Sequence, residues 1–299
     1  MNKAPGKSQF WRVFGPFLGY YGISMVVQAI IGCILVIFNA EAFAEIIIKS
    51  SPDAGTVYTE TMLETLEIVG KYSVEISAVT ALCTIPMTAF LYRKDRKNEQ
   101  INNIPVNKKA PVLKYGLIPV LGFAVCLGFN CLIIMTNLAF VSESYQSISN
   151  MLYAASFPMQ IICLGIIGPV AEELLFRGVI FKRFREHANF KIAAICTSMV
   201  FATIHGSVLQ MIYTFVLGML LAYLCEKYGS IKAPILLHIC VNLVSLVCTE
   251  MQILDLLYAI PKIMAFSIVV CAFVGALMFI QIQKIDEKPI VEPKGDSIL

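Results

Sequence analysis

The feature that most constrains this chain is a series of long apolar runs. A helix needs about 20 mostly apolar residues to cross the hydrocarbon core of a bilayer, and eight segments reach or approach that length. Hydrophobic residues make up 58% of the 299 residues and charged residues only 14%, against about 25% charged residues in soluble domains. A soluble protein of this length could not bury so much apolar surface. The sequence therefore predicts an all-α, polytopic bundle of transmembrane helices, with about eight spans. The expected spans are Phe14–Phe38, Ser73–Tyr92, Tyr115–Phe140, Leu152 to beyond Gly168, Ile192–His205, Leu209–Cys225, Ile231–Cys248 and Ile260–Ile282.

The charges between these runs alternate in sign along the chain. Lys and Arg precede the first span, follow the second, fourth and sixth, and return after the eighth, whereas the intervening connections are acidic or carry few charges. Cytoplasmic loops of membrane proteins are enriched in Lys and Arg. We therefore expect both termini to be cytoplasmic. The basic residues are Lys3, Lys7, Arg12, Arg93, Lys94, Arg96, Lys97, Lys108, Lys109, Lys182, Arg183, Arg185, Lys191, Lys227, Lys232, Lys284, Lys288 and Lys294.

Three parts of the chain are expected to differ in role. Residues 1–150 hold spans one to three, residues 151–250 form the candidate catalytic core, and residues 251–299 hold the last span and a polar cytoplasmic tail. The basic residues lie in short loops and form no basic domain, so a nucleic-acid partner is not expected. The expected surroundings are the lipid bilayer of the cell membrane, in a multi-pass arrangement.

Ionisable residues at membrane depth are costly and usually serve a function or pair with each other. The segment 168–178 reads Gly-Pro-Val-Ala-Glu-Glu-Leu-Leu-Phe-Arg-Gly. Pro169 is expected to begin a fresh helical segment, with Glu172 and Glu173 in its first turn, near the positive end of the helix dipole. Glu173 and Arg177 are spaced i,i+4 and should form a structural ion pair. Neighbouring helix residues point about 100° apart, so Glu172 should meet a different partner.

Two further motifs with polar residues lie in later apolar runs. Phe201 precedes His205 by four residues, and His238 precedes Asn242 by four, so each pair shares one helix face. Glu172 could act as a general base and His205 could help to hold a water molecule. His238 and Asn242 could donate hydrogen bonds to a tetrahedral oxyanion. Each residue also has a structural interpretation, because buried histidines often only pack and Asn often joins membrane helices.

These motifs resemble those of the CPBP family, the CAAX-processing and bacteriocin-processing membrane endopeptidases that are also called the CAAX protease or Abi family. The similarity extends over about residues 168–242, with Ala171, Gly178 and Pro234 also typical of the family. The motifs, in chain order, are Glu172-Glu173-x3-Arg177, Phe201-x3-His205 and His238-x3-Asn242.

The resemblance implies a helical protease whose site opens toward the cytoplasmic half of the membrane and which cuts membrane-associated peptides or proteins without an acyl-enzyme. By position, it assigns Glu172 and His205 to water activation, His238 and Asn242 to the oxyanion, and Glu173 with Arg177 to support. The family's chemistry has been described both as zinc-dependent and as metal-free glutamate catalysis. If zinc is bound, its ligands would be Glu172, His205 and His238; we favour the metal-free form, because Asn is a poor zinc ligand. The substrate need not be prenylated.

Two other functions fit the same sequence. A non-catalytic membrane immunity or scaffold protein could use the same fold. A small-solute transporter with a polar midplane site is also conceivable, but it favours related polar interruptions in both halves of the chain, and polar residues cluster only in the second half here.

Overall fold

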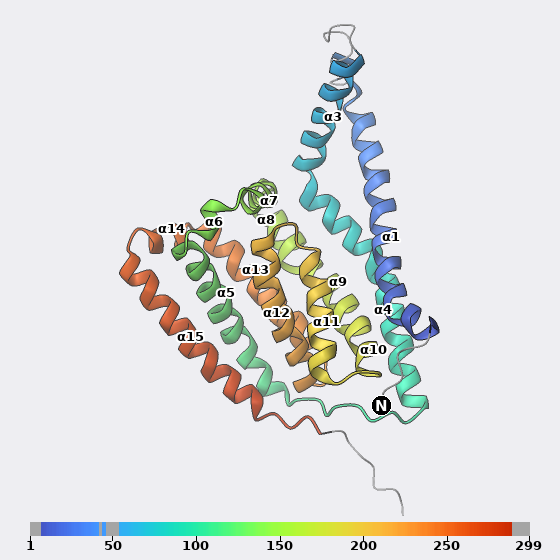
Figure 1. The fold of residues 1–299 in the computed structure, drawn as a ribbon, viewed down its shortest axis with the longest axis vertical. Helices are drawn as coiled ribbons and strands as arrows, with labels where there is room; N and C mark the ends of the chain where they lie inside the picture. The colour runs from blue at the N-terminus through green and yellow to red at the C-terminus, as the bar shows by residue number, and fades with distance from the viewer. Residues whose placement is uncertain (1–6, 42–43, 46–53, 289–299) are drawn as a thin grey trace, which may run out of the picture.

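The computed structural model of the protein describes residues 7–41, 44–45 and 54–288, and these residues form helices joined by short connections (Figure 1). No strand occurs within these ranges. The helices are α1 (Lys7–Phe38), α3 (Ala54–Lys71), α4 (Ser73–Ile101), η1 (Val112–Gly116), α5 (Leu117–Met135), α6 (Leu138–Val141), α7 (Glu143–Tyr153), α8 (Phe157–Gln160), η2 (Ile161–Ile167), α9 (Gly168–Glu173), η3 (Leu174–Phe181), α10 (Lys182–Arg185), α11 (Phe190–Thr203), α12 (Val208–Lys227), α13 (Lys232–Glu250), α14 (Ile253–Tyr258) and α15 (Pro261–Gln283).

The predicted class of fold is confirmed: the chain is a polytopic helical bundle. Seven helices in the described part are long and apolar enough to cross a membrane, and they coincide with seven of the eight expected spans. The expected span Ile192–His205 corresponds to α11, which has only 14 residues. The total of eight spans and the cytoplasmic position of both termini therefore stay predictions.

The segment that carries the two glutamates lies in the middle of the bundle. The pair α1 and α4 packs on one side of the run from η2 to η3, and α11, α12 and α13 pack on the other. The pair α5 and α15 follows beyond α13, with α15 at the outer edge (Figure 1). The outward faces are apolar: Phe266 and Phe273 of α15 are 68% and 64% exposed, as expected of side chains that meet lipid.

The helix through the two glutamates does not break where the sequence predicted. It is continuous over Phe157–Arg185, so the expected fresh start at Gly168 and Pro169 is wrong. Instead the winding changes: η2 and η3 are π-helical, and α9 between them is α-helical. Because the helix is already formed before Pro169, Glu172 and Glu173 are not in the first turn of a separate helix. They therefore do not lie near the positive end of a helix dipole, as the sequence had predicted.

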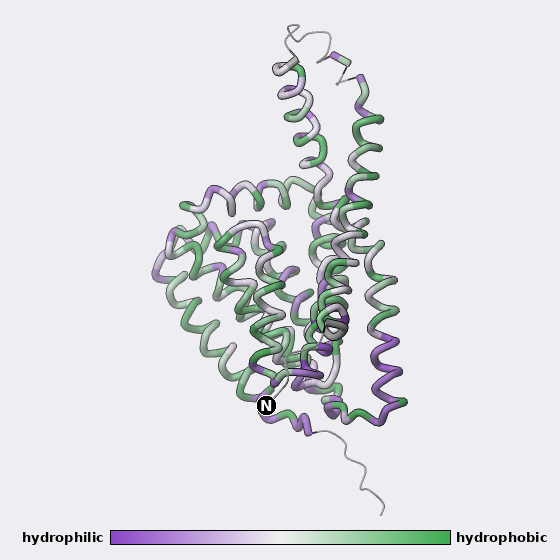
Figure 2. The backbone as a smooth tube through the Cα atoms, turned by 45° about the vertical axis from the view of Figure 1, so that its right-hand side comes forward, coloured by the Kyte–Doolittle hydropathy of each residue, from purple (hydrophilic) through white to green (hydrophobic). Residues whose placement is uncertain are grey.

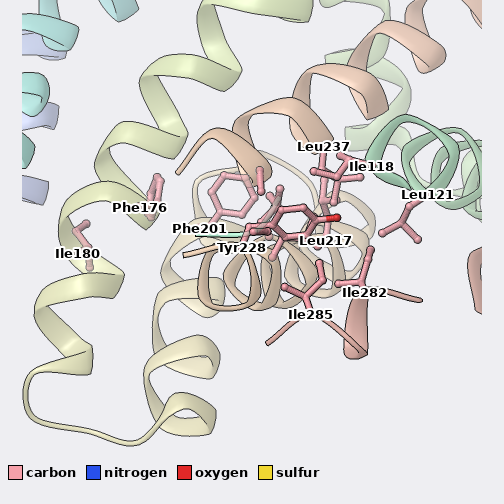
Figure 3. Packing of buried hydrophobic residues seen from close by; sticks show 14 of the residues in the cluster. Ile118, Leu121, Phe176, Ile180, Phe201, Leu217, Tyr228, Leu237, Ile282 and Ile285 are labelled. Carbon is pink, nitrogen blue, oxygen red and sulfur yellow. The ribbon is translucent and has the colours of Figure 1, made fainter. Parts of the chain in front are cut away.

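Close packing between helices holds the bundle together, since lipid provides little hydrophobic drive for helices to associate. A buried core joins η3, α5, α11, α12 and α13, and Figure 3 shows Ile118, Phe176, Phe201 and Leu237 within it. Gly165 of η2 allows α13 to approach η2 closely. A Cβ atom on Gly165 would lie 2.6 Å from Leu243 Cδ2, so a larger residue there would have to displace the Leu243 side chain.

The segment between α4 and η1 crosses one end of the bundle. Ala110 N donates to Tyr228 O at 3.1 Å, and the Asn107 side chain donates to Glu226 O at 3.1 Å. Gly229 has φ +57°, and a Cβ atom on it would lie 2.5 Å from Lys108 O. Both the backbone conformation and the space favour glycine at this turn.

We expect Gly229→Ala to lower the free energy of unfolding by about 1–3 kcal/mol, because alanine is strained at positive φ and its Cβ would displace the backbone of Lys108. The measurement is thermal unfolding of the purified protein in detergent. Gly275→Ala is the matched control, since its Cβ would have only one neighbour, 3.9 Å away. Equal stability of the two variants would contradict the expectation.

Candidate active site

A cavity of about 650 Å³ lies beside α9, and all four predicted catalytic side chains line it. Glu172 comes from α9, His205 from the end of α11, and His238 and Asn242 from α13. Helices α1, α4, α5, α7 and α12 complete its walls. The structure therefore brings these residues to one hollow, although they are up to 70 positions apart in the sequence, from residue 172 to residue 242.

Glu173 and Arg177 form the predicted ion pair behind the cavity. Arg177 Nη1 lies 2.8 Å from Glu173 Oε1, and both side chains are fully buried. Arg177 Nη2 also donates to Gly218 O of α12 at 3.1 Å. A Cβ atom on Gly218 would lie 3.2 Å from that same nitrogen. Glycine thus gives Arg177 room to reach the α12 backbone.

The two glutamates meet the same imidazole from opposite nitrogens. Glu173 Oε1 lies 3.0 Å from His238 Nδ1, and Glu172 Oε2 lies 3.8 Å from His238 Nε2. Glu172 therefore meets a partner other than Arg177, as the sequence predicted, and it shares that partner, His238, with Glu173. The reason is that His238 presents two nitrogens on opposite sides of its ring, so side chains that diverge from α9 can still flank it. Their exposure does differ, with Glu172 28% exposed and Glu173 fully buried.

A carboxylate oxygen can only accept a hydrogen bond, so His238 Nδ1 carries the hydrogen that faces Glu173. The second nitrogen, Nε2, is then the one that faces Glu172 and the cavity. It accepts when the ring is neutral and donates when the ring is protonated. Glu173 therefore fixes the orientation of His238, a role that its pairing with Arg177 alone did not suggest.

His205 is oriented by the backbone of its own helix. Its Nδ1 lies 2.8 Å from Phe201 O, one of the last carbonyls of α11, which lack a partner within the helix. Because a carbonyl only accepts, Nδ1 carries the hydrogen, and the Nε2 lone pair is available when the ring is neutral. His205 thus has the tautomer that a proton acceptor requires.

Asn242 supplies a hydrogen bond that Pro169 cannot. Its Nδ2 donates to Leu164 O in η2 at 2.9 Å. In π-helical winding this carbonyl would pair with the N–H five residues later, which is position 169, and proline has no N–H. The side-chain amide has a second N–H, which remains for a group in the cavity. Asn242 therefore joins α13 to η2 and still has a donor to offer.

Phe201 has a larger part than the sequence indicated. Its ring centroid lies 4.7 Å from that of His205 and 5.8 Å from that of His238, edge-on to both. The Arg177 guanidinium lies 4.4 Å from the same ring, within the range of cation–π attraction. Phe201 thus packs against both imidazoles and against Arg177. The motif marked Phe201 but not these contacts, and Gly218 could not be assigned from sequence because it carries no reactive group.

The residues suggested for zinc do not assemble a metal site in this arrangement. Within the described ranges, no three His, Cys, Asp or Glu side chains lie close enough together to hold a metal ion. Glu172, His205 and His238 share the cavity wall, but a zinc site requires three such ligands on one ion.

The fold and the site together define a multi-pass helical membrane protein with carboxylate, imidazole and amide groups around one cavity. Residues 154–244 match the family model described as type II CAAX prenyl endopeptidase Rce1-like, and this segment contains every predicted site residue. The predicted resemblance to the CPBP family is confirmed by this match.

One curated protein with a similar segment is "Putative membrane peptidase YdiL" of Bacillus subtilis (strain 168). It is 32% identical over 101 residues, which are 34% of this chain and 41% of that protein. The similarity thus spans about two fifths of the relative's length. No solved structure matches the chain.

We expect Glu173→Gln to destabilise the protein by about 3–5 kcal/mol, because it leaves the buried Arg177 charge without its partner. Glu172→Gln removes a partly exposed carboxylate and should change stability far less. Thermal unfolding in detergent compares the two. Similar losses for both variants would show that the buried pair is not a separate structural unit.

Proposed function

We propose that the protein is an intramembrane endopeptidase that hydrolyses peptide bonds with a water molecule activated by Glu172 and His205. The observation that supports this most is the shared cavity, because it places a carboxylate, two imidazoles and an amide around one space in a lipid-embedded bundle. The match of residues 154–244 to a membrane endopeptidase family supports the same class of reaction.

Glu172 is proposed as the general base. It is the carboxylate that reaches the cavity, whereas Glu173 is bound by Arg177 and His238 behind it. The free Nε2 of His205 provides a second acceptor for the same water. A base must lie within hydrogen-bond reach of the proton that it removes, and both groups line the space where the water would sit.

His238 and Asn242 are proposed to hold the oxyanion. Asn242 has one N–H left after its bond to Leu164 O. His238 donates through Nε2 when its ring is protonated, since Nδ1 faces Glu173. With that ring charged, the two carboxylates, Arg177 and His238 sum to zero net charge. The positive groups then offset the carboxylates at a depth where net charge is costly.

The reaction proceeds in two steps. First, the water oxygen bonds to the peptide carbonyl carbon, the carbonyl electron pair moves onto its oxygen, and one water proton passes to Glu172. Second, the electron pair returns, the C–N bond breaks, and the departing nitrogen takes the proton from Glu172. The products are a carboxylic acid and an amine, and the enzyme is regenerated without a covalent intermediate.

The substrates that fit this proposal are membrane-associated peptides or proteins, prenylated or not, in the lipid environment of the cell membrane. Residues 151–250 form the proposed catalytic core, residues 1–150 supply α1, α4 and α5 as further walls of the cavity, and residues 251–299 add α15 on the outside of α5. The alternative is a non-catalytic immunity or scaffold protein, and the first test below distinguishes it from a protease.

We expect Glu172→Gln to reduce cleavage of membrane-anchored peptides by about 10²- to 10⁴-fold, the usual contribution of a general base. The purified protein is assayed in liposomes. Glu250→Gln is the matched control, because it makes the same change at an exposed carboxylate on α13. Equal cleavage by the wild type and Glu172→Gln would remove this carboxylate from the chemistry, and absence of cleavage by the wild type would favour the scaffold alternative.

We expect a strong zinc chelator to leave the cleavage rate unchanged, because the site side chains are not gathered around one metal position. The rate is measured before and after chelation and dialysis. Loss of activity that returns on adding Zn²⁺ would contradict the metal-free mechanism and favour zinc held by Glu172, His205 and His238.

A further inference from the structure

The two ends of the bundle differ sharply in charge. At the end that carries α10, the C-terminal part of α4 and the start of α13, basic residues from distant parts of the chain gather and form ion pairs. Figure 2 shows hydrophilic residues concentrated at this lower end. We call this the basic end. Its ion pairs include Arg12–Glu186, Asp95–Arg183, Lys108–Asp286, Arg185–Glu226 and Lys227–Glu287.

The opposite end carries α3, α6, α7 and α14 (Figure 1). Among the described residues, the only Lys or Arg side chains at this end are Lys71 and Lys262. Its acidic residues include Glu143 at the start of α7 and Asp255 in α14. We call this the acidic end. Lys and Arg mark the cytoplasmic side of a membrane protein, so the positive-inside rule places the acidic end outside.

The cavity lies on the acidic side of the core. Along α12, its lining residues run from Gln210 to Leu217, whereas Lys227 lies at the basic end. Along α13, Lys232 comes first and the lining residues begin only at His238. In both helices the lining therefore occupies the part that is remote from the basic end.

Buried apolar side chains close the cavity on the basic side. Leu221 and Leu224 separate the cavity part of α12 from Lys227, and Phe176 and Ile180 separate Glu172 from α10; all four belong to the buried core. Tyr228 seals the same end, where its hydroxyl donates to Lys114 O at 2.9 Å. A peptide would have to displace this core to reach Glu172 from the basic end.

Helix α7 borders the cavity at the acidic end. Tyr145, Ile148, Ser149 and Leu152 line the cavity at i, i+3, i+4 and i+7, which places them on one face of the helix. Ile148 lies against the turn after α11, where a Cβ atom on Gly206 would be only 2.4 Å from its Cδ1. The acidic end is therefore bounded by a short surface helix instead of by the packed core.

The lining is mostly apolar and nearly uncharged. Glu172 is the one carboxylate among the lining residues of the described chain, and no Lys or Arg joins it. Apolar side chains form most of the remainder, and hydroxyl and amide groups, including those of Tyr20, Ser24, Gln28 and Tyr213, lie among them. Such a surface can hydrogen-bond an extended backbone, and it offers no basic residue to bind an anionic side chain or a free carboxylate.

We propose that the cavity opens toward the extracytoplasmic face of the membrane, so that this protein takes uncharged peptide segments of exported, membrane-anchored substrates. The part of this inference that concerns the substrate rests on the proposed function. The part that concerns the direction of the opening rests on the packing and the charge distribution. It differs from the cytoplasmic opening that the family resemblance implies.

The direction is tested by thiol labelling in cells. Three single-cysteine substitutions are made in a background that carries Cys33→Ala and Cys83→Ala, because these two native thiols are exposed. Ser147→Cys lies on the exposed face of α7, Ser149→Cys on its cavity face, and Lys109→Cys at the exposed basic end. A membrane-impermeant maleimide is applied to intact cells and to inside-out vesicles.

We expect Ser147→Cys and Ser149→Cys to react in intact cells and Lys109→Cys to react only in inside-out vesicles. The reverse pattern would overturn the proposed orientation. Reaction of Ser147→Cys from outside, with Ser149→Cys unreactive there, would overturn the proposed opening. Neither readout requires peptide cleavage, so both stand apart from the test of Glu172.

A second arm tests the substrate. Two reporter proteins carry the same uncharged segment next to a membrane anchor, one on the outer face and one on the inner face. We expect cleavage of the outer reporter alone and its loss in Glu172→Gln. Cleavage of the inner reporter alone would overturn the inference. Cleavage of neither, with labelling from outside, would reject the proposed protease and retain the direction of the opening.

Discussion

The carboxylate of Glu173 is the interaction on which the rest of the site depends. It is fully buried and binds both Arg177 and His238. Arg177 in turn reaches the α12 backbone at Gly218 and the ring of Phe201 in α11. One carboxylate therefore connects its own helix with α11, α12 and α13. A charge at membrane depth is tolerated when it is paired and hydrogen-bonded, and here the pairing also joins the helices that line the cavity.

Two adjacent glutamates have different surroundings, and the proposed mechanism gives them different roles. Glu173 is enclosed by protein, whereas Glu172 is partly exposed in the cavity. His238 lies between them. Because the buried Glu173 holds its Nδ1, the position of Nε2 at the cavity wall is fixed as well. Asn242 makes a comparable connection. It donates to the carbonyl of Leu164, which lacks a backbone partner because Pro169 has no N–H. The residues that contact the proposed water are thus held by residues that do not.

Several features of the fold and site could be predicted from sequence, and others could not. Glu173 and Arg177 are four positions apart, so helical geometry alone brought them together. The contact between Glu173 and His238 spans 65 positions, and no local pattern indicates it. The continuous winding through Pro169 was also missed, since proline usually ends a helix and the π-helical turns depend on neighbouring helices. Phe201 and Gly218 gave no chemical signal because their roles are contact and space.

The sequence by itself determined that the chain is a membrane-embedded helical bundle, because its apolar runs have the length of a bilayer and its charges are confined between them. It also determined which polar residues are exceptional, since ionisable groups in apolar helices are costly. Only the tertiary structure decided that these residues share one cavity, that two carboxylates flank one imidazole, and that the packed core closes the basic end. Those outcomes depend on how helices distant in sequence pack in three dimensions, and hydropathy along a chain does not encode that packing.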